Sequence, residues 1–154
     1  MGAQHSDKGS NRPKVVIYTD GACSRNPGPG GWAAVLTYNG NIKELSGGAA
    51  MTTNQRMELQ AAVEALRCLK VPCQVTLHSD SAYLVNCFRQ KWYQGWQRNG
   101  WRNSKGEPVQ NQDLWEALLA ETARHQVTFE KVKGHAGVAW NERCDELARA
   151  AVPR

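Results

Sequence analysis

The chain has 154 residues, of which 41% are hydrophobic and 21% are charged, a composition that is ordinary for one globular domain with a real core. Its apolar runs stay well short of the roughly 18 residues that a membrane span needs, and its first residues lack the apolar stretch of a secretory signal. We therefore expect neither a membrane protein nor a secreted one. The formal net charge of +5 permits a polyanionic partner without requiring one.

The ends of the chain and its cysteines give the expected organisation. Residues 1–13 are small, polar and charged, so we expect a flexible tail, with 14–154 forming one domain. The five cysteines are scattered, odd in number and free of any Cys-x-x-Cys pair, which argues against a disulfide framework or a zinc site. We expect a monomer in the cytoplasm, because the cysteine pattern suits a reducing compartment and no coiled-coil stripe is present.

The first third of the chain predicts three strands. Residues 14–19 form a run rich in β-branched residues, which is typical of a buried strand. Residues 32–38 and 41–47 are strand-like runs on either side of Asn39-Gly40, and Asn-Gly in that position is a strong hairpin signal. The loop between the first two strands is rich in glycine and proline and therefore carries few bulky side chains around Asp20. A bulky ligand could approach there.

The rest of the chain alternates helices and strands. Thr52 and Gln55 have the spacing of a capping box for a helix that Pro72 ends. Further along we expect a cap near Asn111 and, in order, strand 74–79, helix 81–88, helix 112–125, strand 127–133, loop 134–141 and helix 142–151. A hairpin that leads into alternating strands and helices predicts an α/β fold with a five-stranded mixed sheet flanked by helices.

One segment is conspicuously basic. Between Ser81 and Gly106 the chain has no Asp or Glu, whereas the cations there are Arg89, Lys91, Arg98, Arg102 and Lys105.

Four acids are candidates for a metal site. Asp20 and Asp80 each follow a predicted strand, and ligands of open α/β sheets bind outside the carboxyl ends of strands. Glu58 shares a helix face with alanines that would let this helix approach the sheet closely, and Asp145 lies one turn into the last helix. Oxygen ligands without histidine or thiolate companions suit Mg²⁺ or Mn²⁺.

Each of these acids also has an ordinary structural explanation. An acid after a strand often serves as a turn residue or a helix cap. Glu58 would be favoured by the helix dipole near a helix start, and Asp145 could pair with Arg149 one turn later. The spacing alone leaves both interpretations open.

Five blocks of sequence, in order, resemble type 1 ribonuclease H of the bacterial ribonuclease HI branch. They are YTDGACSRNPGPGGWAAVL, TTNQRMEL, SDSAYL, WYQGWQRNGW and VKGHAGVAWNERCDELARAA, and the match spans about residues 14–151. The resemblance implies a ribonuclease H-like fold with a basic protrusion, the handle. It also implies an endonuclease that hydrolyses the RNA strand of an RNA–DNA hybrid without sequence preference, leaving 5′-phosphate and 3′-hydroxyl ends.

The resemblance also implies roles for individual residues. Asp20, Glu58, Asp80 and Asp145 match the four metal-binding carboxylates, which hold two Mg²⁺ ions during catalysis, with Mn²⁺ as a substitute. His135, in the Gly-His-Ala-Gly loop, matches a histidine that assists proton movement or product release. Taken alone, His135 would be an ordinary loop histidine.

Substrate contacts follow from the same resemblance. Those implied to read the hybrid's minor groove are Asn26, Asn54 and Gln55. Thr53 and Asn111 match a pocket for a DNA-strand phosphate. The channel for the deoxyribose strand is matched by Tyr83, Trp92, Trp96 and Ser104. The tryptophans of the handle could instead form a small core that anchors it, and Gln97 and Asn99 stand where relatives often carry lysine or arginine.

Two other functions remain open at this point. A protein with this fold could bind hybrids without cutting them, or it could be a transposase-, integrase- or resolvase-like nuclease that acts on DNA. The presence of all four acids and His135 argues against the first function, and the Thr-Thr-Asn-Gln-Arg-Met-Glu-Leu block and the handle argue against the second.

Overall fold

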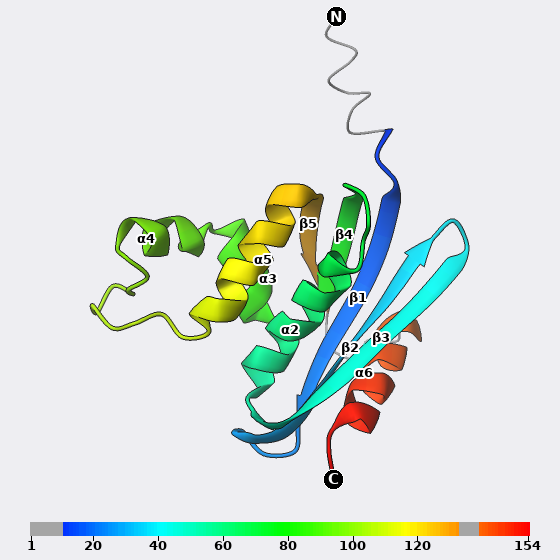
Figure 1. Ribbon diagram of the computed structural model, residues 1–154, viewed down its shortest axis with the longest axis horizontal. Helices are drawn as coiled ribbons and strands as arrows, with labels where there is room; N and C mark the ends of the chain where they lie inside the picture. The colour runs from blue at the N-terminus through cyan, green and yellow to red at the C-terminus, as the bar shows by residue number, and fades with distance from the viewer. Residues whose placement is uncertain (1–10, 133–138) are drawn as a thin grey trace, which may run out of the picture.

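The computed structural model describes residues 11–132 and 139–154, which form a five-stranded sheet with helices on both faces (Figure 1). The strands lie in the order β3-β2-β1-β4-β5. β1 pairs antiparallel with β2 and parallel with β4, while β2–β3 is antiparallel and β4–β5 is parallel. The predicted mixed sheet is thus confirmed. Its strands are β1 (Lys14–Cys23), β2 (Gly28–Tyr38), β3 (Asn41–Thr52), β4 (Gln74–Ser79) and β5 (Gln126–Lys131).

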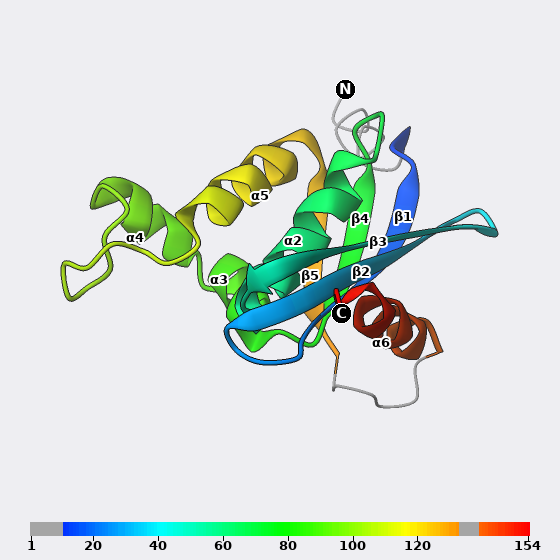
Figure 2. The same ribbon diagram turned by 60° about the horizontal axis from the view of Figure 1, so that its bottom comes forward.

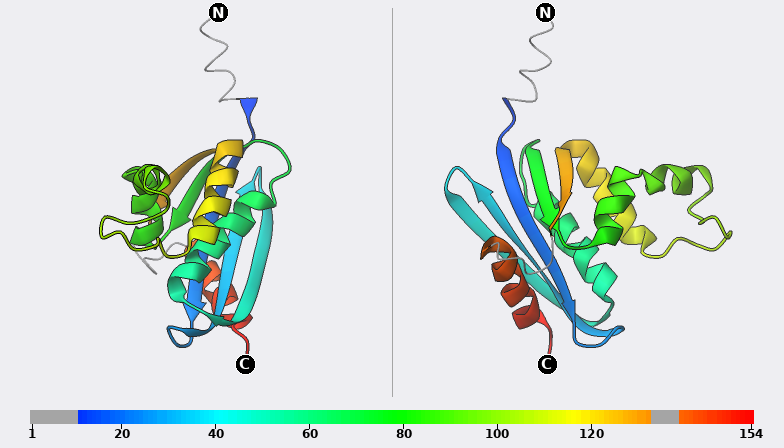
Figure 3. Two further views of the ribbon diagram at one scale, coloured as in Figure 1. Left: turned by 60° about the vertical axis from the view of Figure 1, so that its left-hand side comes forward. Right: turned by 180° about the vertical axis from the view of Figure 1, so that it is seen from behind.

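The helices divide between the two faces of this sheet. α2 (Asn54–Arg67), α3 (Ala82–Arg89) and α5 (Gln112–Arg124) bury one face, where Ile17, Leu77 and Trp115 lie in a common core. α6 (Ala139–Ala151) packs alone on the opposite face, against β1, β2 and β3 (Figures 2 and 3). None of the helices within the described ranges is long and apolar enough to cross a membrane.

The β2–β3 hairpin turns at Asn39-Gly40 as predicted, but both strands are longer than expected. Gly40 has φ +78°, a conformation that glycine adopts without strain. Gly28, Gly30 and Gly31, which we placed in the loop before the second strand, lie inside β2. α6 comes so close that a side chain at Gly31 would collide with the backbone of Ala148. Gly31 therefore makes room for α6. That the loop also leaves room for a ligand at Asp20 stays a prediction.

Two helix starts differ from the prediction. The cap of α2 is Thr53, not Thr52, and its Oγ1 accepts a hydrogen bond from the backbone N–H of Arg56 (3.2 Å). Asn111 does occupy the cap position of α5, but in a left-handed conformation and without a side-chain cap bond. α6 begins at Ala139 rather than at residue 142.

The basic segment contains a short helix that its sequence did not predict. α4 (Trp92–Arg98) is only seven residues long, none of its residues is fully buried, and no side chain caps its start. α4 and the chain that follows it project from the body of the molecule (Figure 1), as the handle prediction requires. An aromatic cluster fastens this projection, with the rings of Trp96 and Trp115 5.5 Å apart and those of Trp96 and Trp101 6.0 Å apart.

Candidate active site

The parallel pairing of β1 with β4 brings two of the predicted acids together. Tyr18 is the register partner of His78, so Asp20 and Asp80 come two residues later at the same end of neighbouring strands. Asp20 is buried, with 6% of its surface exposed, and its Oδ1 accepts a hydrogen bond from the N–H of Gly21 (2.8 Å). Asp80 follows the last residue of β4 and is half-buried.

Helix α2 supplies the third acid. Glu58 lies on its buried face with Ala61 and Ala62, as predicted, and is only 8% exposed. Gly21 allows this approach, because a Cβ there would come within 2.7 Å of the Glu58 backbone nitrogen. Carboxylate oxygens of Asp20, Glu58 and Asp80 all lie within 4.8 Å of one another. We call these three residues the acidic group.

The acidic group is electrostatically costly in the absence of a cation. Burial raises the pKa of Glu58 well above its ordinary value of 4.5, and the hydrogen bond with Asp80 and the charges of Asp80 and Asp20 raise it further. Glu58 Oε1 and Asp80 Oδ1 are buried and have no hydrogen-bond partner within the described ranges. Buried acceptors of this kind are expensive unless a positive partner satisfies them. An all-oxygen donor set fits a hard divalent cation.

Asp145, the fourth predicted acid, is not part of this compact group. Asp145 pairs with Arg149 in the same helix (2.8 Å), which is the structural alternative that its spacing suggested. Its neighbour Cys144 nevertheless lies beside the acidic group. Burial, helped by the charge of Asp20, raises the pKa of Cys144 to about 12. His135 lies outside the described residues, and its role stays a prediction.

Most of the predicted substrate contacts line a single hollow of about 630 Å³ beside the start of α2. We call it the amide pocket. Across it, the backbone N–H of Asn54 donates to Asn26 Oδ1 (2.9 Å), which links the loop after β1 to the helix that carries Glu58. The pocket is lined by Asn26, Thr53, Asn54, Gln55, Gln110 and Asn111.

The residues predicted to line the channel for the DNA strand lie toward the handle. Tyr83 accepts a hydrogen bond from Trp115 Nε1 (3.1 Å), and its ring lies 6.2 Å from that of Trp92. Trp92 and Trp96 are partly buried against the core, so they also form the anchoring cluster that we considered as the alternative. Ser104 is exposed in the loop beyond α4.

Arg56 is a residue of this region that the sequence analysis missed. Its guanidinium binds both oxygens of Asp113 (3.0 and 2.7 Å) and donates to Asn111 Oδ1 (3.3 Å), which joins α2 to α5. A cation in the first turn of a helix opposes the helix dipole, and α2 has no acid there. That unfavourable placement was the available signal that a specific partner holds Arg56.

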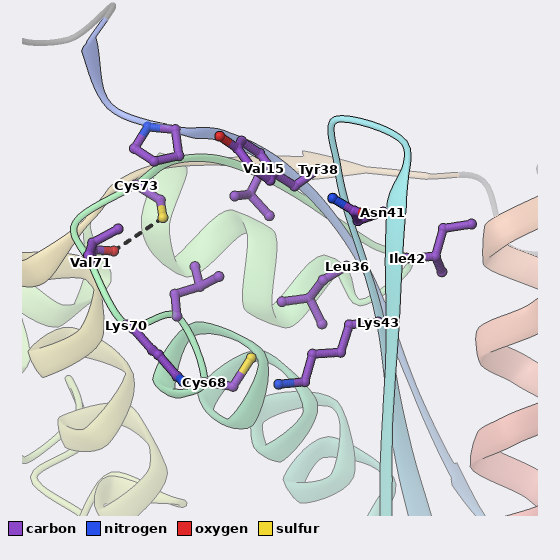
Figure 4. Close-up of a pocket in the computed structure, with 12 residues that line it drawn as sticks. Val15, Leu36, Tyr38, Asn41, Ile42, Lys43, Cys68, Lys70, Val71 and Cys73 are labelled. Carbon is purple, nitrogen blue, oxygen red and sulfur yellow. Dashed lines mark hydrogen bonds between the residues drawn. The ribbon is translucent and has the colours of Figure 1, made fainter.

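A separate hollow of about 330 Å³ opens at the other end of β1 (Figure 4). It is lined mainly by apolar side chains, among them Val15, Leu36 and Leu69, and within the described ranges none of the predicted site residues lines it. Lys43 and Lys70 also line it, and no Asp or Glu of the described part of the chain does. Because it lies away from the acidic group, it takes no part in the site described above.

Comparison with known proteins agrees with this architecture. The family model described as RNase H matches residues 12–153. Ribonuclease H of Symbiobacterium thermophilum is 67% identical over 139 residues, which cover 90% of this chain and 95% of that protein. Ribonuclease H of Moorella thermoacetica is 64% identical over 139 residues, which cover 90% of this chain and 91% of that protein.

Solved structures show the same fold. The type 1 enzyme LC9-RNase H1 matches with a TM-score of 0.81 and 30% identity, covering 92% of this chain and 72% of that one. LC11-RNase H1, solved in complex with an RNA/DNA hybrid, matches with a TM-score of 0.69 and 25% identity, covering 90% of this chain and 96% of that one. With its sheet order, its convergent acids and a family match over nearly its whole length, the chain belongs to the ribonuclease H family.

Proposed function

We propose that this ribonuclease H cuts the RNA strand of RNA–DNA hybrids at the acidic group, with Mg²⁺ as its natural cofactor and Mn²⁺ as a substitute. The observation that carries the proposal is the meeting of three largely buried carboxylates from β1, α2 and the end of β4 within 4.8 Å. An enzyme of this family hydrolyses the phosphodiester bonds of the RNA strand internally. Two similar proteins are known as complexes with such hybrids, which supports the same substrate here.

Asp20, Glu58 and Asp80 would hold the metal ions. When bound, divalent ions supply Lewis-acid chemistry at the scissile phosphate. The chain's own contribution is to fix the three carboxylates through strand register and through the close approach of α2 at Gly21. We propose that Asp145 completes the ligand set after giving up its pairing with Arg149. We propose that His135 moves a proton during turnover.

The amide pocket would hold the duplex beside the acidic group. Amide and hydroxyl groups can donate to and accept from ribose 2′-hydroxyls, which distinguish RNA from DNA. We assign this reading to Asn26, Asn54 and Gln55, and a phosphate of the DNA strand to Thr53 and Asn111. Tyr83, Trp92, Trp96 and Ser104 would line the path of the DNA strand toward the handle.

Basic residues of the handle would add sequence-independent affinity. Arg98, Arg102 and Lys105 are exposed there, and contacts of such residues with phosphates make nucleic-acid binding dependent on salt. Gln97 and Asn99 carry no charge, so the electrostatic contribution of this handle is smaller than that of a fully basic one.

The test is cleavage of strand-labelled RNA–DNA hybrid, DNA duplex and RNA duplex, each with Mg²⁺ and with EDTA. We expect cuts only in the RNA strand of the hybrid and only with Mg²⁺. Asp80→Asn should lower turnover by at least about 10²-fold, because one carboxylate ligand is lost. Glu116→Gln, a change at an exposed acid of α5, is the matched control and should leave the rate unchanged.

Each alternative function has its own outcome in this experiment. A protein that binds the hybrid without cutting it, and whose Asp80→Asn variant behaves like the wild type, would be a silent binding module. Cleavage of the DNA duplex would indicate the transposase-like activity instead.

We also propose that the protein acts as a monomer in the cytoplasm. All five cysteines are unpaired in the structure, which suits a reducing compartment. Light scattering coupled to gel filtration should give a mass near 17.1 kDa, and twice that mass would contradict the monomer.

A further inference from the structure

We propose that the ion pair between Arg56 and Asp113 positions Asn111 in the amide pocket and thereby sets the affinity for the hybrid. Arg56 and Asp113 are positioning residues in this proposal. The inference rests on the proposed function, because that function assigns a DNA-strand phosphate to Thr53 and Asn111.

Arg56 contacts both halves of the assigned phosphate site. Its backbone N–H donates to Thr53 Oγ1 (3.2 Å), and its Nη1 donates to Asn111 Oδ1 (3.3 Å). Thr53 caps α2 and Asn111 occupies the cap position of α5, so one residue connects the starts of two helices that are distant in the sequence. The separation of these two pocket residues therefore depends on Arg56.

The side chain of Asn111 is available for this role because it does not cap its own helix. Asn111 has a left-handed backbone, with φ 63°, and makes no side-chain cap bond. With Oδ1 accepting from Arg56, the amide nitrogen is the group left to donate to a ligand in the pocket. A phosphate oxygen accepts such a bond, whereas the reversed amide would present an acceptor that repels it.

Asp113 holds the guanidinium of Arg56 in place. The two bonds of 3.0 and 2.7 Å form a fork, which fixes the plane of the guanidinium as well as its position. The same pair largely cancels the charge of Arg56, so the pair contributes geometry to the pocket and little net positive field. Lysine cannot reproduce the fork.

The chain offers a matched control at the other end of the same two helices. Arg124 of α5 binds Glu121 (3.0 Å) and donates to the backbone oxygens of Leu66 (3.3 Å) and Leu69 (3.0 Å) at the end of α2. Like Arg56 it joins α2 to α5 through an ion-paired guanidinium, but it does not line the amide pocket. If the arginines act only by holding the two helices together, substitution of either should change KM alike. If Arg56 positions Asn111, only its substitution should change KM.

The experiment measures kcat, KM and melting temperature for Mg²⁺-dependent cleavage of an RNA–DNA hybrid over a range of salt concentrations. We expect Arg56→Gln, Arg56→Lys and Asp113→Asn each to raise KM about tenfold with kcat within about twofold of the wild type, the size of effect that one or two hydrogen bonds produce. Arg124→Gln should lower the melting temperature without changing KM. Asn111→Ala should raise KM as Arg56→Gln does, and the double variant should be no worse than either single one.

Opposite results would overturn the proposal. If Arg56 bound the phosphate directly, Asp113→Asn would free its charge and lower KM, and Arg56→Gln would reduce the slope of log KM against log salt by about 0.9. The proposal predicts an unchanged slope. It also fails if Arg56→Gln leaves KM unchanged or if Arg124→Gln raises KM equally. Failure of the wild type to cut the hybrid would instead overturn the proposed function.

Discussion

At the scale of single residues, the site combines groups that are unfavourable without a ligand. Glu58 is buried beside two other acids, and a buried oxygen of Glu58 and one of Asp80 lack hydrogen-bond partners within the described part of the chain. Natural proteins keep such arrangements where a function requires them. The folded protein carries this cost in stability whenever no cation is bound.

The sign of the Glu58 effect on stability follows from its pKa. Because the folded-state pKa lies above the ordinary 4.5, this group's contribution to stability is fully present below that value and is lost as pH rises through the raised pKa. We therefore expect Glu58→Gln to melt higher than the wild type in EDTA at pH 8, on the order of 1 kcal/mol or about 2–4 °C. The difference should shrink toward pH 4.

Thermal unfolding followed by circular dichroism in EDTA at several pH values checks this prediction. Glu116→Gln, at an exposed position of α5, controls for the loss of one negative charge and should have the same melting temperature as the wild type. A Glu58→Gln variant that melts below the wild type at pH 8 would contradict the argument from repulsion and burial.

At the scale of elements, glycines decide how closely the helices approach the sheet. Gly21 admits α2 with Glu58, and Gly31 and Gly48, which are register partners in β2 and β3, admit α6. A side chain at Gly48 would meet the backbone of Ala151, as one at Gly31 would meet Ala148. The approach of these helices brings Glu58 to the acidic group and Cys144 to its edge.

Gly31→Ala should therefore destabilise the protein by about 1–3 kcal/mol, because the added methyl group forces α6 away from the sheet. Gly95→Ala is the matched control, since a Cβ on this glycine of α4 meets nothing within 4 Å. In a helix that change should be neutral or stabilising by up to about 1 kcal/mol. Urea unfolding of both variants tests the contrast, and equal stability of the two would refute it.

At the scale of the whole molecule, β1 and α2 link the fold to the site. β1 pairs with β2 and β4, and it contacts α6 and α2 as well. The carboxylates come from segments far apart in the sequence, so they meet only when the sheet and α2 are both formed. Metal binding should therefore be coupled to global folding.

We expect Mg²⁺ at about 100 times its dissociation constant to stabilise the wild type by about 2.7 kcal/mol against thermal unfolding, and EDTA to reverse the effect. Asp80→Asn should show a much smaller gain, because it lacks one ligand. The measurement is the melting temperature with and without Mg²⁺ at matched ionic strength. A gain that is equal in the wild type and in Asp80→Asn would mean that the ion binds elsewhere.

Patterns within short stretches of the chain were enough to predict many of its strands, turns and helices. The strand before Asp20, the Asn39-Gly40 turn and the alanine face around Glu58 are recognisable because local periodicity and turn chemistry act over a few residues. The five blocks of resemblance predicted the family and four metal-binding carboxylates, three of which form the acidic group. The short helix α4 escaped detection because it buries no residue and its ends carry no clear signal.

The tertiary structure alone decided several of the contacts between distant residues. Whether the glycines of β2 break a strand or admit α6 depends on a helix more than a hundred residues away. The link from Arg56 to Asn111 depends likewise on distances across the folded chain. Long-range contacts follow from packing the whole core at once, and that information is absent from the periodicity of any single segment.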